Sequence, residues 1–386
     1  MGLAEAGQAQ MWHVVTYSRV PGREDLARLQ RAGATGGWVL RHLRMVAVKV
    51  RTNEVERLAA LDGVLSVYPG ERAVFVPSPV PEGADRISGL REPVALAAAL
   101  VRGVRVQMGG ATGGRGDAAS EEIPAVALVD TGLDETHPAF ADVVVRANLR
   151  FKLDSAPTDF QCPSATPWES HCDPVGHGTA VAGAVLAGWE AAERSTGGRS
   201  SECLSEGSHA ARRMVPALAL VSLSAGNSPA WVVEVLAAMD YVMGHGASLG
   251  VRVINNSWAV GGPWDPRHPI NVATRQLAEA GFVVVFSARS ADGEFNAFAR
   301  APWVIPVDGR SVEGAVSAAP LVQVVPPVPG EPLQPGRLQV VLVGPRLVPG
   351  VPLAGTSNLT AINGTSAAAG YVSGWLLWAA SCPGQR

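Results

Sequence analysis

The chain has 386 residues and a formal net charge of −3; 47% of its residues are hydrophobic and 17% are charged. This composition excludes a largely disordered chain, and the small net charge without a long basic run excludes a dedicated nucleic-acid binder. No stretch of about 20 apolar residues is present, so no membrane span is predicted. The four cysteines are too few for a fold that is built on disulfides.

The N-terminal part predicts a small α+β domain over residues 11–78, preceded by a polar tail at residues 1–10. Its expected order is strand, helix, strand, helix, strand, at residues 12–16, 23–31, 45–50, 54–61 and 64–68. Ten Lys and Arg against seven Asp and Glu give residues 1–80 a net charge of +3, which leaves −6 for the remainder. Opposite charges favour docking of the two parts.

Residues 79–122 predict a linker and the start of the next domain, because prolines at 77, 79 and 81 mark its beginning and a Gly-rich run lies at 109–114. An apolar segment at 94–101 predicts one helix within them. Over residues 123–386, apolar runs of strand length alternate with helical patterns, which is typical of a parallel sheet covered on both faces. These runs are residues 125–129, 218–223, 251–255, 282–286 and 340–343. The Pro-rich stretch 322–335 predicts a loop.

Three side chains lie where such a sheet does chemistry. Asp130 follows the strand at 125–129, and ligands of open parallel sheets gather at the carboxyl ends of strands. His177 lies at the start of an apolar helix. Ser366 begins a second one, where free N–H groups favour developing negative charge. Taken singly, each also has an ordinary structural interpretation: a strand-ending turn, a histidine bonded to the backbone, and a helix N-cap.

The order of the three residues narrows the chemistry. A serine nucleophile needs a base that takes its proton and an acid that orients the base. The last histidine is His268, so none follows Ser366, and this excludes the α/β-hydrolase order. Asp130, then His177, then Ser366 is the order of subtilisin.

The segments around these residues resemble the catalytic motifs of the subtilases, the subtilisin-like serine proteases. VDTGLD at 129–134 resembles the aspartate motif, GHGT at 176–179 the histidine motif, and GTS at 364–366 the serine motif. The resemblance implies a subtilisin-like three-layer α/β fold with a mostly parallel sheet. It also implies a serine endopeptidase that hydrolyses polypeptides through an Asp-His-Ser triad.

Residues 11–78 resemble a subtilisin propeptide, which is a small α+β, ferredoxin-like domain. In the family this segment assists folding and inhibits the enzyme until it is removed. The resemblance therefore implies a zymogen whose own propeptide is an intramolecular inhibitor. Self-cleavage is expected between Val74 and Pro81, since GADRIS at 83–88 resembles the start of a mature enzyme.

Two further segments resemble walls of the substrate cleft. Residues 255–258 resemble the edge strand that pairs with an extended substrate, a mode that reads the peptide backbone first. The second segment follows the apolar run at 282–286. The implied substrate-binding residues are Ser257, Trp258, Ala259, Ser287, Ala288 and Arg289.

The oxyanion hole departs from the family pattern. Ser290 stands where the family has an asparagine, and loss of that donor costs about 2.7–4 kcal/mol in subtilisin itself. Ser290 is the candidate donor beside the backbone N–H of Ser366, with Asn296 as a substitute. Arg289 replaces a glycine of the pocket for the residue before the scissile bond. It either narrows that pocket, favours an acidic side chain there, or turns outward to solvent.

The implied mechanism requires no cofactor. Calcium binding is left open but lacks support at the usual family position, where Ala139 replaces an acidic ligand and Asp142 has the wrong spacing. Cys162 and Cys172 predict a local disulfide. The alternative is a zinc site that adds two histidines. Those histidines are His171 and His177, while Cys203 and Cys382 are left either paired or free.

Two functional interpretations follow. The first is a self-processing serine endopeptidase, which the complete triad favours. The second is a catalytically impaired pseudoprotease that binds peptides or a partner, its chemistry lost through Ser290, Arg289 and the short sequence after Ser366. The propeptide and disulfides imply a secreted or extracytoplasmic location, although residues 1–11 lack the basic and apolar regions of a signal peptide.

Overall fold

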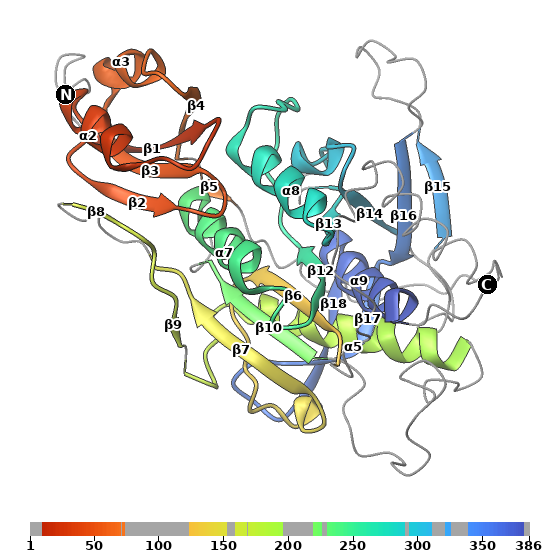
Figure 1. Cartoon of the computed structure of the whole chain (residues 1–386). Helices are drawn as coiled ribbons and strands as arrows, with labels where there is room; N and C mark the ends of the chain where they lie inside the picture. The colour runs from red at the N-terminus through yellow and green to blue at the C-terminus, as the bar shows by residue number, and fades with distance from the viewer. Residues whose placement is uncertain are drawn as a thin grey trace, which may run out of the picture.

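The computed structural model describes residues 10–70, 72–73, 123–152, 159–167, 169–195, 219–225, 230–289, 293–310, 321–325 and 339–381. Two bodies are visible in Figure 1: an N-terminal domain in red and orange, and a larger domain that continues to the C-terminus. The predicted linker at 79–122, with its helix at 94–101, lies outside the described residues. No helix among the described residues is both long and apolar enough to cross a membrane.

The N-terminal domain confirms the five predicted elements and adds one strand. The predicted ones are β1 (Gln10–Tyr17), α2 (Arg23–Arg31), β3 (Met45–Arg51), α3 (Val55–Ala59) and β4 (Val64–Pro69). The added strand is β2 (Gly37–Leu40), which is only four residues long and begins in a glycine pair that reads as a turn. The sheet order is β4-β1-β3-β2-β8, and β8 (Phe160–Gln161) comes from the other domain.

Both faces of this small sheet are covered by apolar packing. Successive side chains of a strand point to opposite faces. In β3, Val46 and Val48 pack with Leu29 of α2 inside the N-terminal domain. Met45 and Ala47 instead share a hydrophobic cluster with the larger domain. The N-terminal domain therefore buries an apolar face only by staying docked.

The larger domain contains the expected sheet. Its order is β15-β16-β14-β13-β12-β6-β10-β7-β9, and pairs from β7 to β14 and from β14 to β16 are parallel. The strands that were predicted are β6 (Ala125–Asp130), β10 (Ala219–Ser224), β12 (Val251–Asn256), β13 (Val283–Ser287) and β16 (Gln339–Pro345). The others are β7 (Val144–Arg150), β9 (Thr166–Pro167), β14 (Ile305–Arg310) and β15 (Leu321–Val325).

The prediction of a loop at 322–335 is wrong for its first residues, 322–325, which form a strand. β15 covers Leu321–Val325 and pairs antiparallel with β16, Val322 lying beside Leu342. The run Leu-Val-Gln-Val-Val is rich in β-branched residues and precedes the prolines, so it forms a strand at the sheet edge. Residues 326–338 lie outside the described part of the chain.

Helices cover both faces of the large sheet, which confirms the three-layer arrangement. α7 (Val232–His245) and α8 (Pro269–Glu279) pack on one face, and α5 (His177–Ser195) and α9 (Thr365–Ser381) on the other (Figure 1). β6 is buried on both sides: Ala127 joins the α7 side and Leu128 the α9 side. The apolar helix predicted to begin at Ser366 is confirmed as α9, whose residues from Ala367 to Trp378 are buried.

Glycines let α5 and α9 touch through their backbones. A Cβ at Gly374 would lie 1.9 Å from the carbonyl oxygen of Val185, and a Cβ at Gly188 would lie 1.9 Å from that of Tyr371. Only glycine allows such an approach. The chain reaches α9 through the hairpin of β17 (Leu347–Pro352) and β18 (Leu359–Asn363). This packing fixes the starts of the two helices that carry His177 and Ser366.

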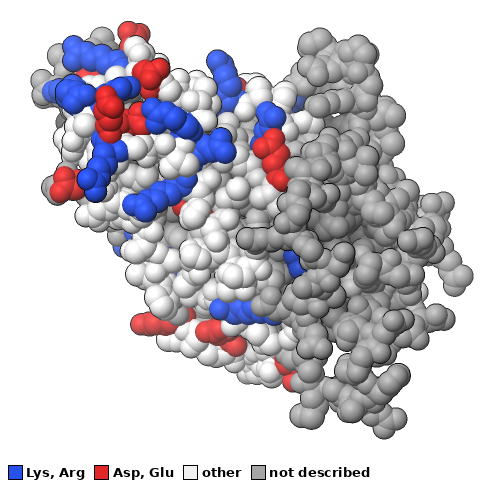
Figure 2. Space-filling view, in the orientation of Figure 1, with Lys and Arg blue, Asp and Glu red and all other residues white. Residues whose placement is uncertain are grey.

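The N-terminal domain docks on α7 and α8. Asp240 of α7 accepts hydrogen bonds from the backbone N–H groups of His42 at 2.8 Å and Leu43 at 2.9 Å. Tyr68 donates its hydroxyl proton to Asp265 before α8. Figure 2 shows that Lys, Arg, Asp and Glu gather over the N-terminal domain, whereas the described face below it carries few charges. Docking therefore rests on buried polar contacts and apolar area more than on surface charge.

Candidate active site

Asp130 and His177 form a buried pair at the carboxyl end of the parallel sheet. Asp130 ends β6 and His177 begins α5. Asp130 is 1% exposed and His177 is 2% exposed. Nδ1 of His177 lies 2.7 Å from Oδ1 of Asp130, which also accepts the N–H of Thr131 at 2.8 Å. An ionised carboxylate only accepts, so Nδ1 carries the proton and Nε2 is the basic nitrogen.

The environment of His177 favours its protonated form. Burial lowers its pKa, but the charge of Asp130 and the hydrogen bond to it raise the pKa by more, so the net shift is upward. Asp173 adds to the rise through its charge. The pair can therefore accept a proton on His177 and stabilise the imidazolium that results.

Asp173 holds the loops that carry this pair, and sequence reasoning missed it. Its Oδ1 accepts from the hydroxyl of Thr131 at 2.8 Å and from the N–H of Gly176 at 2.9 Å. Its Oδ2 accepts from the N–H and the hydroxyl of Thr179 at 2.8 and 2.7 Å. The available signal was an acid four residues before His177, close to the helix N-terminus where carboxylates are favoured.

The small residues around His177 let the two loops meet. A Cβ at Gly178 would lie 2.2 Å from the carbonyl oxygen of Gly132. The N–H of Gly178 donates to the hydroxyl of Thr131 at 2.9 Å. Gly132 itself has φ +139, a conformation that L side chains rarely adopt. Larger residues at either position would push the aspartate and histidine loops apart.

Ser366 lies in the first turn of α9, as predicted, and is bonded to the segment that follows β12. Its hydroxyl donates to the carbonyl oxygen of Ser257 at 2.9 Å, and the hydroxyl of Ser257 donates back to the Ser366 carbonyl at 3.1 Å. β12 is the direct neighbour of β6, with Asn255 level with Leu128. Ser257 thus connects Ser366 to the strand beside the one that ends in Asp130.

The two segments expected to line the substrate cleft are joined by side-chain hydrogen bonds. The carbonyl oxygen of Trp258 accepts from the hydroxyl of Ser287 at 3.1 Å and from the amide of Asn296 at 3.0 Å. The Trp258 ring is buried against Phe286 and Phe298, so this side chain is core. Five of the six expected residues are buried: Ser257, Trp258, Ala259, Ser287 and Ala288.

Asn296 is wrong as a substitute oxyanion donor. Its amide nitrogen donates to the carbonyl oxygens of both Trp258 and Ser287, at 3.0 and 2.9 Å, which uses its two protons. Its oxygen accepts the N–H of Phe298 at 3.2 Å. Asn296 therefore ties the cleft segments together. Ser290, the first candidate donor, lies outside the described residues.

Arg289 is the exposed member of the expected cleft residues, with 43% of its side chain accessible. Its Nε donates to Oδ2 of Asp308 at 2.8 Å, and Nη1 donates to the carbonyl oxygen of Gly293 at 3.2 Å. Its own carbonyl accepts the hydroxyl of Thr365 at 2.9 Å, next to Ser366. The guanidinium is thus held by an acid at the surface, and its charge is largely compensated.

A second edge strand, which the sequence did not indicate, meets the chain that leaves the N-terminal domain. β5 (Arg72–Ala73) pairs antiparallel with β11 (Ala230–Trp231), which leads directly into α7. A peptide that adds to an exposed strand edge is held by its backbone. Arg72 and Ala73, near the C-terminal end of the N-terminal domain, therefore bind as an extended peptide. The expected cleavage region, residues 74–81, lies outside the described part.

The predicted disulfide is wrong in this structure, because Cys162 and Cys172 are both free thiols. Cys162 follows β8 beside the N-terminal sheet, whereas Cys172 lies in the turn before His177. A group of three potential metal ligands lies on the surface among the described residues, and the alternative zinc set of cysteines and histidines is not assembled there. The group consists of Glu169, His171 and Cys172, without Asp142. Cys203 and Cys382 lie outside the described residues.

Comparisons with known proteins agree with this architecture. The family model Peptidase_S8, described as the subtilase family, matches residues 122–381. The structure of fervidolysin from Fervidobacterium pennivorans, a keratinolytic enzyme related to subtilisin, matches 95% of this chain with 19% identity and a TM-score of 0.51. The chain covers 54% of that protein and so spans about half its length.

The epidermin leader peptide processing serine protease EpiP from Staphylococcus aureus also matches 95% of this chain. Identity is 12%, the TM-score is 0.52, and 86% of EpiP is covered. No curated protein sequence gave a match. At these identities the two structures bear on the fold, whereas the family model covers well over half of the chain. The chain therefore belongs to the subtilase family, the subtilisin-like serine peptidases.

Proposed function

We propose that this subtilase is a serine endopeptidase in which Ser366 is the nucleophile, His177 the general base and Asp130 the residue that orients His177. The observation that carries the proposal is the buried hydrogen bond of 2.7 Å between His177 Nδ1 and Asp130 Oδ1. It leaves Nε2 as the base. Ser366, in the first turn of the buried helix α9, is hydrogen-bonded to Ser257 after β12, the strand beside β6. Polypeptides are the proposed substrates, and the reaction uses no cofactor.

The resting geometry requires one rearrangement before attack. The Ser366 hydroxyl now donates to the Ser257 carbonyl, and it must turn toward His177 when a substrate is bound. Catalytic hydrogen bonds often form only in the substrate complex. Ser366 Oγ then bonds to the peptide carbonyl carbon while its proton moves to His177. The same proton passes to the leaving amine, and water releases the acyl group by the reverse path.

The N-terminal domain is proposed to be an inhibitory propeptide. It docks through α7 and α8, and β5 binds the edge of β11 as an extended peptide would. In this proposal, the residues that follow β5 are the segment that Ser366 cleaves. Self-cleavage at residues 74–81 and a secreted or extracytoplasmic location are parts of this proposal.

An active-site probe separates the enzyme from the pseudoprotease alternative. The full chain is treated with a fluorophosphonate, and intact mass is followed over time. Labelling at Ser366 that disappears in Ser366→Ala supports the enzyme. Ser381→Ala is the matched control, because Ser381 ends the same helix and, within the described part of the chain, its hydroxyl donates to the Leu377 carbonyl. The absence of labelling in folded protein would support the pseudoprotease.

Self-processing is read from the same samples. Loss of about the first 74–81 residues in the parent chain, but not in Ser366→Ala, supports the zymogen. If both proteins stay intact while the parent is labelled, the enzyme stands and self-processing fails. Ser290→Asn then tests the oxyanion donor, since the family asparagine should raise the labelling rate if Ser290 limits it.

A further inference from the structure

A segment of the larger domain completes the sheet of the N-terminal domain. β8 (Phe160–Gln161) pairs parallel with β2, with Gly37 beside Phe160 and Trp38 beside Gln161 (Figure 1). The N–H of Gly37 donates to the carbonyl oxygen of Asp159 at 3.4 Å. Without β8, β2 would be an unpaired sheet edge, which readily accepts another strand.

The other end of the same segment is fixed to the large sheet. β9 (Thr166–Pro167) pairs antiparallel with β7, with Thr166 beside Arg150 and Pro167 beside Leu149. The hydroxyl of Thr166 also donates to the Arg150 carbonyl at 3.3 Å. Residues 159–167, which we name the strap, therefore bridge the two sheets within nine residues.

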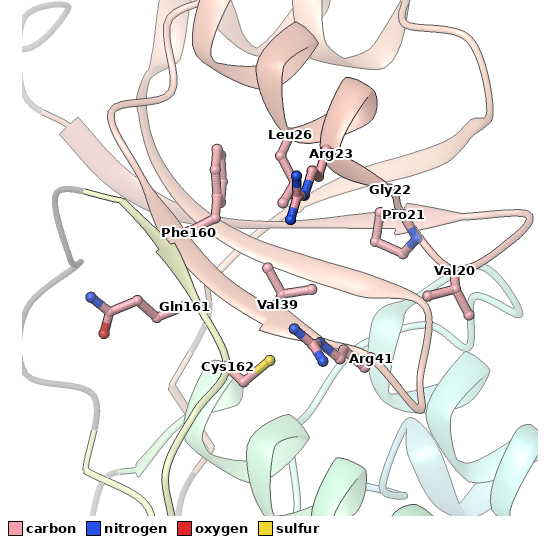
Figure 3. Close-up of a pocket in the computed structure, with 10 residues that line it drawn as sticks. All are labelled: Val20, Pro21, Gly22, Arg23, Leu26, Val39, Arg41, Phe160, Gln161 and Cys162. Atoms are coloured by element: carbon pink, nitrogen blue, oxygen red, sulfur yellow. The ribbon is translucent and has the colours of Figure 1, made fainter.

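Phe160 anchors the strap in the N-terminal domain. Its ring packs against the hydrophobic cluster of that domain, which includes Leu29 and Val39, and lies near Leu26 of α2 (Figure 3). A cavity of about 350 Å³ remains beside it, between Cys162 on the strap and Arg23 and Arg41 on the domain. The contact between the strap and the N-terminal domain thus consists of a short strand pairing and one aromatic side chain. Such a contact can separate without unfolding either domain.

We propose that the strap holds the N-terminal domain in place after the chain between the domains is cut. Docking on α7 and α8 is one attachment. The strap is a second one, at the β2 edge of the N-terminal sheet, whereas β4 forms the other edge. Two attachments on one rigid body act together, so release requires both to open at once. Cleavage alone then leaves the N-terminal domain bound, and the strap is one of the two contacts whose opening limits its release.

The consequence for activity rests on the proposed function, because retention inhibits only if the N-terminal domain is an inhibitor. The physical claim does not depend on it. The test therefore uses the full chain with Ser366→Ala and a recognition sequence for an external protease in place of the Gly-rich run at 109–114. After the external cut, dissociation of the N-terminal domain is timed by repeated gel filtration.

Two strap variants probe the side chain and the backbone separately. Phe160→Ala removes the anchor and is expected to speed dissociation roughly tenfold or more, from the area that the ring buries. Gln161→Pro removes a strand N–H and is expected to act in the same direction. Gln161→Ala is the matched control, because the Gln161 side chain is exposed and its backbone N–H is kept. Thermal unfolding of the uncut proteins checks that all of them fold.

Equal dissociation rates for the parent, Phe160→Ala and Gln161→Pro, with all three folded, would overturn the proposal. The repetition with Ser366 intact separates the two claims. If strap variants release the domain faster but peptidase activity does not rise with release, the strap stands and inhibition by the N-terminal domain fails. If activity rises on release, but release is equally fast in the parent and in the strap variants, the N-terminal domain is an inhibitor and the strap proposal fails.

Discussion

The carboxylate of Asp173 accepts two hydrogen bonds from Thr179, one from its backbone N–H at 2.8 Å and one from its hydroxyl at 2.7 Å. Thr179 is the third residue of the helix that His177 begins. The other oxygen of Asp173 holds Thr131, the neighbour of Asp130. One buried acid therefore sets the distance between the proposed base and the residue that orients it.

Asp173→Asn is expected to lower both stability and activity. The amide would present protons to donors that now meet a carboxylate, which costs about 2–3 kcal/mol of the free energy of unfolding. The pKa of His177 should also fall, since the charge of Asp173 helps to raise it. Thermal unfolding and the pH dependence of kcat/KM measure the two effects. Asp142→Asn, at an exposed acid of the same domain, should leave both unchanged.

Asp130→Asn is expected to reduce kcat by roughly 10⁴-fold, the scale of the Asp→Asn substitution in the triad of chymotrypsin-type proteases. Activity requires neutral His177, and its raised pKa places the acid limb of the kcat/KM profile above the ordinary value of about 6.5. Loss of the carboxylate should move the residual limb to lower pH. A limb that stays at the same pH in Asp130→Asn would mean that another group titrates there.

The sequence predicted the elements whose signals are local. β6, β12 and β13 are continuous apolar runs, and α9 is a helix of small and apolar residues; all four formed where expected. β8 and β11 are two-residue strands that exist only because a distant segment pairs with them. No local pattern encodes such pairing, so both were missed.

The candidate site was predictable in its residue types but not in its hydrogen bonds. Motif order singled out Asp130, His177 and Ser366, and a hydrogen bond joins Asp130 and His177. The Ser366 hydroxyl donates to one carbonyl oxygen, and the Asn296 amide donates to two. These partners depend on how the ends of β12 and β13 lie side by side. Tertiary geometry decides these partners, and spacing along the chain does not reveal them.

Asp240→Ala is expected to weaken docking of the N-terminal domain. The variant would leave the buried N–H of Leu43 and the partly buried N–H of His42 without their acceptor, at about 1–3 kcal/mol for the buried group and less for the other. In the externally cut chain, release should accelerate at least tenfold. Asp240→Asn is the matched control, because its amide oxygen still accepts. Release that is equally fast in both variants would point to the charge rather than to the hydrogen bonds.

The pH dependence of this contact follows from the pKa of Asp240. Burial raises that pKa, although the two backbone N–H groups and nearby histidines oppose the shift. Docking therefore favours the protonated acid: the contribution is present below the ordinary pKa of about 3.9 and is lost as pH rises through the raised value. The cut N-terminal domain should therefore dissociate more slowly at about pH 4 than at a pH above the raised pKa of Asp240. Asp240→Asn should remove that dependence.

Asp308→Asn is expected to expose the charge of Arg289 to substrates. The parent should show little preference for an acidic residue before the scissile bond, because Asp308 compensates the guanidinium at 2.8 Å. The variant should raise kcat/KM for Glu over Gln at that position by about two- to fivefold, the scale of an exposed ion pair. Paired fluorogenic peptides measure the ratio, and Glu279→Gln, which breaks an exposed ion pair on α8, serves as the control.

Arg289→Leu in the Asp308→Asn background completes this test. If Arg289 acts through charge, the gained preference for Glu disappears in the double variant while cleavage of the Gln peptide stays the same. If Arg289 instead narrows the pocket, its removal raises kcat/KM for both peptides alike, and Asp308→Asn alone changes neither ratio nor rate. A response to neither substitution would mean that Arg289 faces solvent away from the bound peptide, with Asp308 serving only to hold the end of β13 against β14.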